Sequence, residues 1–297
     1  MDITVVKAGL SYGADIPGSE KAPDALEQKG LLGTVASLGH RIETVSILQS
    51  ELPDEHRFRD SLRVKWAGEI LEVTNRIYEA VDGAYEAGRF PFVIGGDQSA
   101  ALGSLKATCN RYSDAAVVWI GSHANMNSYQ TSPSANFHGM VLASMTGLSD
   151  SRFEDNLQRF LNPRNLILVG TRSVDEEEQK ILLEQKVNEI PCRKVIGCGA
   201  TGRGNSAIES IMSIIRRRKA KRIHLSIDVS VMDPVFAPAV NVPVEDGLSP
   251  EDLYGLVRCL ASTGMLCCVD LLEYNPLRDE DGLTAASIES VMYGLWG

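Results

Sequence analysis

The chain has 297 residues, of which 44% are hydrophobic and 23% charged, and its formal net charge is −10. This composition excludes a disordered or collagen-like chain and is sufficient to bury a large core. The acidic excess argues against nucleic acid or an anionic membrane as a partner. Six cysteines without a CxxC pair, and an N-terminus without a basic-then-apolar pattern, favour a cytoplasmic protein.

Apolar runs of strand length recur along the chain, and most of them are continuous rather than alternating. Such runs, rich in β-branched residues, are typical of parallel strands that helices cover on both faces. Eight strands are predicted, at residues 3–7, 41–47, 92–95, 115–120, 166–170, 193–196, 222–227 and 265–271.

Helical patterns separate these runs, and Pro23 suits the first turn of the earliest one. They cover residues 21–38, 61–87, 99–110, 150–160, 175–188, 206–220, 250–262 and 284–295. The alternation predicts an α/β protein of three layers, α/β/α, around a parallel sheet of about eight strands. Because no linker, repeat or low-complexity tract interrupts it, residues 1–297 are interpreted as a single domain.

Polar residues gather in the turns that follow four of the predicted strands. These turns are 95–99 (GGDQS), 121–127 (GSHANMN), 228–234 (DVSVMDP) and 273–276 (EYNP). The loop 128–139 adds further polar side chains after the second of them. Because ligands bind beyond the carboxyl ends of parallel strands, we expect these groups to converge on one crevice.

These turns resemble those of the arginase family of manganese ureohydrolases, from the first predicted strand to the last helix. The family patterns are Gly-Gly-Asp-His-Ser, Asp-Ala-His-x-Asp-x-Asn, Ser-x-Asp-x-Asp-x-x-Asp-Pro and Glu-x-Asn-Pro, with Ser-Gly-Asn-x-His-Gly in the long loop. Here the last pattern becomes SANFHG at residues 134–139. The resemblance implies the arginase fold and a homo-oligomer, either trimeric or hexameric.

The metal positions of that family are largely substituted in this chain. By resemblance, its six ligands to two Mn²⁺ ions fall on Gln98, Gly121, His123, Asn125, Asp228 and Ser230. Only His123 and Asp228 are ligands of the original type. The family's four carboxylates offset the charge of both ions, whereas one carboxylate would leave roughly +3 uncompensated in a cleft, which is strongly unfavourable.

We therefore expect no cofactor and little or no hydrolysis of arginine, because no metal-bound hydroxide would form. The alternative is an active ureohydrolase that cleaves a guanidine or amidine C–N bond with a single or altered metal site. In that case His123 and Asp228 would hold Mn²⁺, with Gln98 or Asn125 as a further ligand, and His138 would transfer protons.

Other pocket positions of the family persist. By resemblance, Glu273 faces the guanidinium and His138 shuttles protons, so these two are the candidate catalytic residues. Glu273 and Asp175 would pair with guanidinium or ammonium, which predicts a small guanidino or amino-acid-like ligand. The positions that match substrate-binding residues are Asn127, Ser134, Asn136 and Asp175, and Val242 stands where the family usually has a Thr.

Each candidate also has a purely structural interpretation. His123 is explained without a metal as a hydrogen-bonded, buried imidazole. Asp228 can accept backbone N–H groups of its own turn, and Asp97 and Asp233 are typical turn-building residues.

Two further motifs lie outside this set. Residues 197–202 (GCGATG) match the dinucleotide-binding pattern, although residues 203–205 lengthen the loop before the next helix, which favours a connecting loop. Residues 216–222 contain four Arg and two Lys, which suit the carbonyl end of a helix. An anion-binding or subunit-contact patch is the alternative for this basic stretch.

Overall fold

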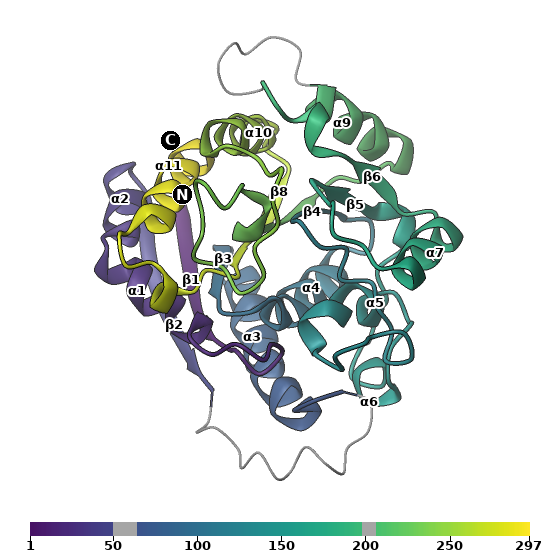
Figure 1. Ribbon diagram of the computed structural model, residues 1–297. Coiled ribbons are helices and arrows are strands. Elements are labelled where there is room, and N and C mark those ends of the chain that lie inside the picture. The colour runs from purple at the N-terminus through teal and green to yellow at the C-terminus, as the bar shows by residue number, and fades with distance from the viewer. Residues whose placement is uncertain (50–63, 198–205) are drawn as a thin grey trace.

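A computed structural model describes residues 1–49, 64–197 and 206–297 (Figure 1). Eight strands form one sheet in the order β2-β1-β3-β8-β7-β4-β5-β6, and every pair is parallel. The strands are β1 (Asp2–Gly9), β2 (Arg41–Leu48), β3 (Phe90–Gly95), β4 (Ala116–Ile120), β5 (Leu166–Val169), β6 (Asn188–Ile190), β7 (Ile223–Asp228) and β8 (Leu266–Leu272).

The central strands are buried along their whole length, as their continuous apolar sequences predict. Every residue of β4 and β7 is buried, whereas the edge strand β2 is exposed at five of its eight positions. A parallel strand covered on both faces buries all of its side chains, so no alternation appears in its sequence.

Helices cover both faces of the sheet (Figure 1). One face packs against α1 (Ala22–Gln28), α2 (Leu31–Ser37), α9 (Ser206–Arg218), α10 (Pro250–Ser262) and α11 (Leu283–Trp296). The other packs against α3 (Ala67–Glu86), α4 (Ala101–Arg111), α5 (Val141–Met145), α6 (Ser151–Glu154) and α7 (Glu176–Gln185). The predicted three-layer α/β/α architecture is confirmed.

The predicted sixth strand, at residues 193–196, is wrong. The strand is Asn188–Ile190, which pairs with β5, and Cys192–Lys194 forms a short 3-10 turn after Pro191. Of the two apolar side chains in the predicted strand, Val195 is buried, whereas Ile196 is 59% exposed. Only one of them therefore contributes to the core, and it does so from the end of the 3-10 turn rather than from a strand.

Several helix predictions also need correction. The pattern at 21–38 is divided into α1 and α2 at Gly30, whose φ of 94° a continuous helix cannot accommodate. The pattern at 150–160 yields only the short α6, and α7 ends before the left-handed Lys186. The predicted 61–87 helix begins at Ala67, after the left-handed Trp66, and its positions 61–63 lie outside the described residues.

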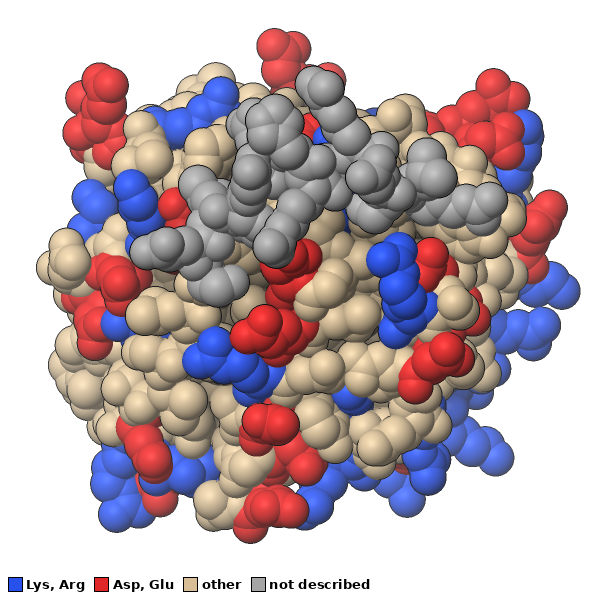
Figure 2. Space-filling view, turned by 90° about the horizontal axis from the view of Figure 1, so that it is seen from below, with Lys and Arg blue, Asp and Glu red and all other residues tan. Residues whose placement is uncertain are grey.

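The basic stretch 216–222 ends α9 and leads into β7. Arg217 and Arg218 donate to the side-chain oxygens of Asn188 and Asn165 at 3.1 and 2.8 Å. Within the described ranges, no cation of the stretch lies within 4.0 Å of a carboxylate. On the face seen from below, basic and acidic side chains are interspersed outside the grey atoms (Figure 2).

Residues 198–205 of the dinucleotide-like loop lie outside the described residues, so that motif keeps its two interpretations. Among the described helices, none is long and apolar enough to cross a membrane.

Candidate functional site

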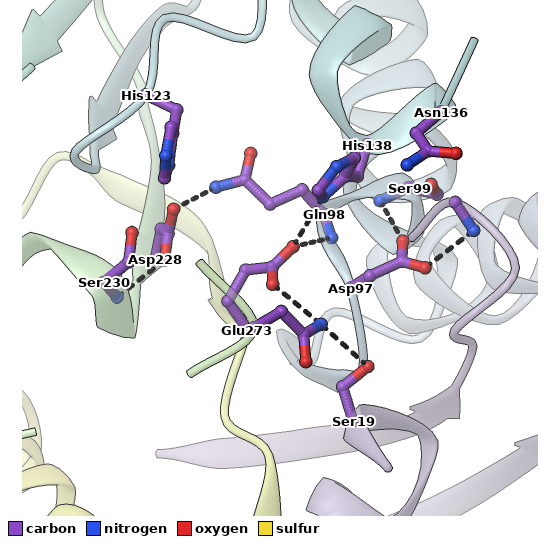
Figure 3. Close-up of polar contacts among 12 residues, drawn as sticks. Ser19, Asp97, Gln98, Ser99, His123, Asn136, His138, Asp228, Ser230 and Glu273 are labelled. Atoms are coloured by element: carbon purple, nitrogen blue, oxygen red, sulfur yellow. Dashed lines mark hydrogen bonds and ion pairs between the residues drawn. The ribbon is translucent and has the colours of Figure 1, made fainter. Parts of the chain in front are cut away.

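Four neighbouring strands at the centre of the sheet, β3, β8, β7 and β4, end at one edge, and the segment after each contributes to one pocket of about 230 Å³. Figure 3 shows side chains from these segments directed toward one another. Ten of the twelve predicted site residues line the pocket: Gln98, His123, Asn125, Asn127, Ser134, His138, Asp175, Asp228, Ser230 and Glu273.

The other two predicted residues, Gly121 and Asn136, lie next to the pocket lining. A Cβ atom on Gly121 would lie 3.2 Å from the Cβ atom of Asp228, so a side chain there would require Asp228 to shift slightly. Asn136 donates from Nδ2 to Oδ2 of Asp15 at 2.8 Å. The side-chain carbonyl oxygen of Asn136 has no partner among the described residues.

Gln98 forms the centre of the pocket floor, in the turn after β3. Asp97 begins this turn by accepting the N–H of Ser99 at 2.7 Å, which confirms its turn-building role. The backbone N–H of Gln98 donates to Oε1 of Glu273 at 2.9 Å, and its amide Nε2 donates to Oδ2 of Asp228. These two bonds connect the ends of three adjacent strands.

Asp228, at the end of β7, is held by its own turn. Its Oδ1 accepts the backbone N–H of Ser230 at 2.7 Å, as the turn interpretation predicts. Burial and the neighbouring charge of Glu273 raise the pKa of Asp228 above that of a free carboxyl. One carboxylate oxygen therefore serves the turn, and the other accepts the Gln98 amide.

His123 lies on the β4 side of the floor and is half-buried. Its Nδ1 lies 2.9 Å from Oγ of Ser122, which in turn lies 2.6 Å from Oγ of Ser230. Burial lowers the pKa of His123 to about 4. The ring is therefore neutral at neutral pH, in agreement with the hydrogen-bonded interpretation.

Glu273 follows β8 in a left-handed backbone conformation, with φ at 71°. Besides the Gln98 N–H, it receives a hydrogen bond on Oε2 from Asn241 Nδ2 at 3.2 Å, and His138 Nδ1 lies 3.5 Å from Oε1. Burial disfavours the charged form of His138, but the hydrogen bond with Glu273 and its charge outweigh burial and raise the pKa of His138.

The pocket wall opposite this floor carries the predicted substrate-binding residues. Asp175 caps α7, and Glu178 completes a reciprocal capping box with it. The amide of Asn127 donates to Oδ2 of Asp175 at 2.9 Å. Ser134 accepts the backbone N–H of Asn136 at 3.2 Å, which shapes the loop above the pocket.

Electrostatically, the lining is acidic. It contains the carboxyl groups of Asp175, Glu178, Asp228 and Glu273, and no Lys or Arg among its described residues. Such a lining favours a cationic ligand.

Sequence reasoning missed Arg172 and Asn241, because no motif of catalytic type surrounds either of them. Arg172 follows β5 and connects two loops at the pocket edge. Its guanidinium donates to five backbone carbonyl oxygens at 2.7 to 3.3 Å: those of Gly170, Ser230, Val231, Val244 and Glu245.

The fold and the pocket thus define an α/β/α protein with an acidic pocket at the carboxyl edge of its parallel sheet. A family model described as "Arginase family" matches residues 1–297. Relatives named arginase from Brevibacillus brevis and Bacillus caldovelox are 27% and 28% identical, over 100% and 99% of this chain and 98% of each relative. The chain therefore belongs to the arginase family.

Solved structures agree. An arginase from Entamoeba histolytica, in complex with L-ornithine, has a TM-score of 0.90 at 26% identity and covers 100% of this chain and 98% of its own. An arginase from Bacillus subtilis has a TM-score of 0.87 at 26% identity, over 100% of this chain and 99% of its own. The fold named by the sequence resemblance is confirmed.

Proposed function

We propose that this protein binds a small cationic ligand of the guanidino or amino-acid type and hydrolyses arginine very weakly or not at all. The observation that carries the proposal is the contact between Gln98 and Asp228. At the position where the arginase resemblance expects a metal ligand, an amide N–H donor faces the carboxylate that would have held the ion.

The donor set does not fit two divalent cations. Of the six assigned positions, Gly121 contributes no side-chain donor, and Gln98 directs its NH₂ group at Asp228. The Asp228 carboxylate already accepts two hydrogen bonds. Hard cations such as Mn²⁺ favour anionic oxygen or imidazole ligands, and the positions carry one of each.

The rest of the pocket suits an organic cation. Four carboxyl groups line it without a Lys or Arg among the described residues. The Entamoeba relative was solved with L-ornithine, an amino acid that ends in an ammonium group. We assign Glu273 and Asp175 to the cationic groups of the ligand, Asn127, Ser134 and Asn136 to its carboxylate side, and His138 to proton exchange.

The first test is elemental analysis of protein incubated with excess Mn²⁺ and then desalted. We expect near-zero metal per chain, for which an active arginase of the same fold is the positive control. Calorimetry with arginine, ornithine and agmatine should then give heat for at least one of them. No heat with any of the three at millimolar concentration would overturn the binding proposal.

The same samples test the single-metal alternative. Retention of about one ion per chain, with urea release that depends on added metal and disappears in His123→Ala, would make the protein an active ureohydrolase. We further propose a homo-oligomer, trimeric or hexameric, which sedimentation velocity would measure directly.

A further inference from the structure

We propose that the side-chain carbonyl oxygen of Gln98 accepts a hydrogen bond from a guanidinium head group, which makes Gln98 the residue that selects the ligand. This inference rests on the proposed binding function and names the ligand class that the pocket floor recognises.

The first observation is an unpaired acceptor. Gln98 is 1% exposed, and its Oε1 has no hydrogen-bond partner among the described residues. Buried polar atoms are nearly always paired, because an unpaired one loses its bonds to water without replacement. Because Gln98 lines the pocket, its orphaned buried oxygen marks a place where a donor is missing.

The second observation fixes the direction of that oxygen. The amide nitrogen donates to Asp228, and the backbone N–H of the same residue donates to Glu273. Turning the amide over would take the N–H donor away from the buried Asp228 carboxyl and leave the amide nitrogen of Gln98 without that acceptor. The carbonyl therefore points away from Asp228, as Figure 3 shows.

The third observation is the charge around the missing donor. Asp228 and Glu273 flank Gln98 and are 2% and 5% exposed. No Lys or Arg from the described part of the chain lines the pocket to offset them. The imidazole of His138 faces Glu273, with Nδ1 3.5 Å from Oε1, and no ion pair with Asp228 is present among the described residues. A ligand group that satisfies this floor must supply N–H donors and carry positive charge.

A guanidinium meets both conditions better than an ammonium. It presents several N–H donors in one plane and is more weakly hydrated than an ammonium, so transfer to a buried floor costs less. A neutral ureido group of the same shape has an oxygen in place of one NH₂, and that oxygen would face acceptors. The floor therefore predicts the preference arginine over lysine over citrulline.

The test is calorimetric titration of the full chain with arginine, lysine and citrulline. In Gln98→Met, which keeps the side-chain length and removes the acceptor, we expect affinity for arginine to fall roughly 10- to 100-fold. Citrulline affinity should change far less, so the arginine-to-citrulline ratio collapses. Exposed Gln28→Met is the matched control.

The outcomes distinguish a failure of the role of Gln98 from a failure of the proposed ligand-binding function. Arginine binding by wild type with an unchanged ratio in Gln98→Met would overturn the role of Gln98 and leave the binding function standing. An equal loss for all three ligands would assign Gln98 a structural role only, which also overturns the inference. No binding by wild type would overturn both.

Discussion

Two polar clusters both include residues of β7 and of β8 or the turn after it, and they differ in how completely their polar atoms are hydrogen-bonded. The pocket floor lies at the carboxyl ends and contains Gln98, Asp228 and Glu273. The second cluster lies within the core, between the strands and α4, where His224 Nε2 lies 2.8 Å from Asp270 Oδ2. His224 and Asp270 are 0% exposed.

The core cluster is a closed network. Ser104 donates to Asp270 at 2.9 Å, and Thr108 lies 2.7 Å from His224 Nδ1 and 2.9 Å from the Tyr85 hydroxyl. The ligand-type atoms of His224, Cys268 and Asp270 lie within 4.8 Å of one another, as in a metal site. Both ring nitrogens nevertheless have hydrogen-bond partners within the protein.

The pocket floor, in contrast, keeps one buried acceptor open on Gln98. Both clusters combine carboxyl groups with other polar side chains on neighbouring strands, so residue type does not distinguish them. The two clusters are distinguished by the completeness of their hydrogen bonding. The closed network stabilises the fold, whereas the floor has an unpaired acceptor to which we propose that a ligand donates.

The largest expected change in the free energy of unfolding comes from a substitution in the closed network. Asp270→Ala leaves Nε2 of His224 without its partner in the core, although Ser104 keeps its bond to the Ala101 carbonyl oxygen, and should lower the free energy of unfolding by about 3–5 kcal/mol. Urea unfolding followed by circular dichroism measures this, with the exposed Glu184→Ala as a control. A loss below about 1 kcal/mol would mean that the network is not closed.

An intermediate effect is expected at the pocket edge, where Arg172 is paired as completely as the core network. Arg172→Ala removes its bonds to five carbonyl oxygens and should lower the free energy of unfolding by about 2 kcal/mol. The loss is smaller than in the core because water can reach some of the carbonyl oxygens that the guanidinium no longer contacts. Arg216→Ala, on the exposed end of α9, should change it by less than about 0.5 kcal/mol. Equal losses of unfolding free energy in the two variants would contradict a stabilising role for the five hydrogen bonds of Arg172.

The smallest change in stability should come from the floor itself. Gln98→Met loses the bond to Asp228, which is destabilising, but it also removes the unpaired oxygen, which is stabilising. The free energy of unfolding should therefore change by less than about 1 kcal/mol. Thermal and urea unfolding without ligand measure the balance. A loss above about 3 kcal/mol would show that Gln98 belongs to a closed network like that of Asp270, and the contrast would fail.

Much of the fold was predictable because parallel strands leave a clear pattern. Continuous apolar runs located seven of the eight strands, and the turns after β3, β4, β7 and β8 converge as the rule for open sheets predicts. The sixth strand was missed because Asn188–Ile190 is short and polar, while exposed Ile196 imitated a strand.

The candidate site was predictable only in part. Motif positions placed Gln98 and Glu273 near each other, but which amide atom is left unpaired depends on packing that one sequence does not encode locally. Arg172 and the pair His224 and Asp270 carry no motif at all. His224 and Asp270 lie inside apolar strands, where the sequence pattern indicates only burial.

The left-handed backbone of Glu273 sets stability against the acidity of the pocket at one residue. A side chain other than glycine costs about 1–2 kcal/mol in that conformation. Glycine would relieve this strain, but it would also remove a carboxyl group from the pocket lining and the acceptor of the Gln98 backbone N–H. The residue that gives the pocket floor part of its acidity is thus also one that the folded chain holds at a cost.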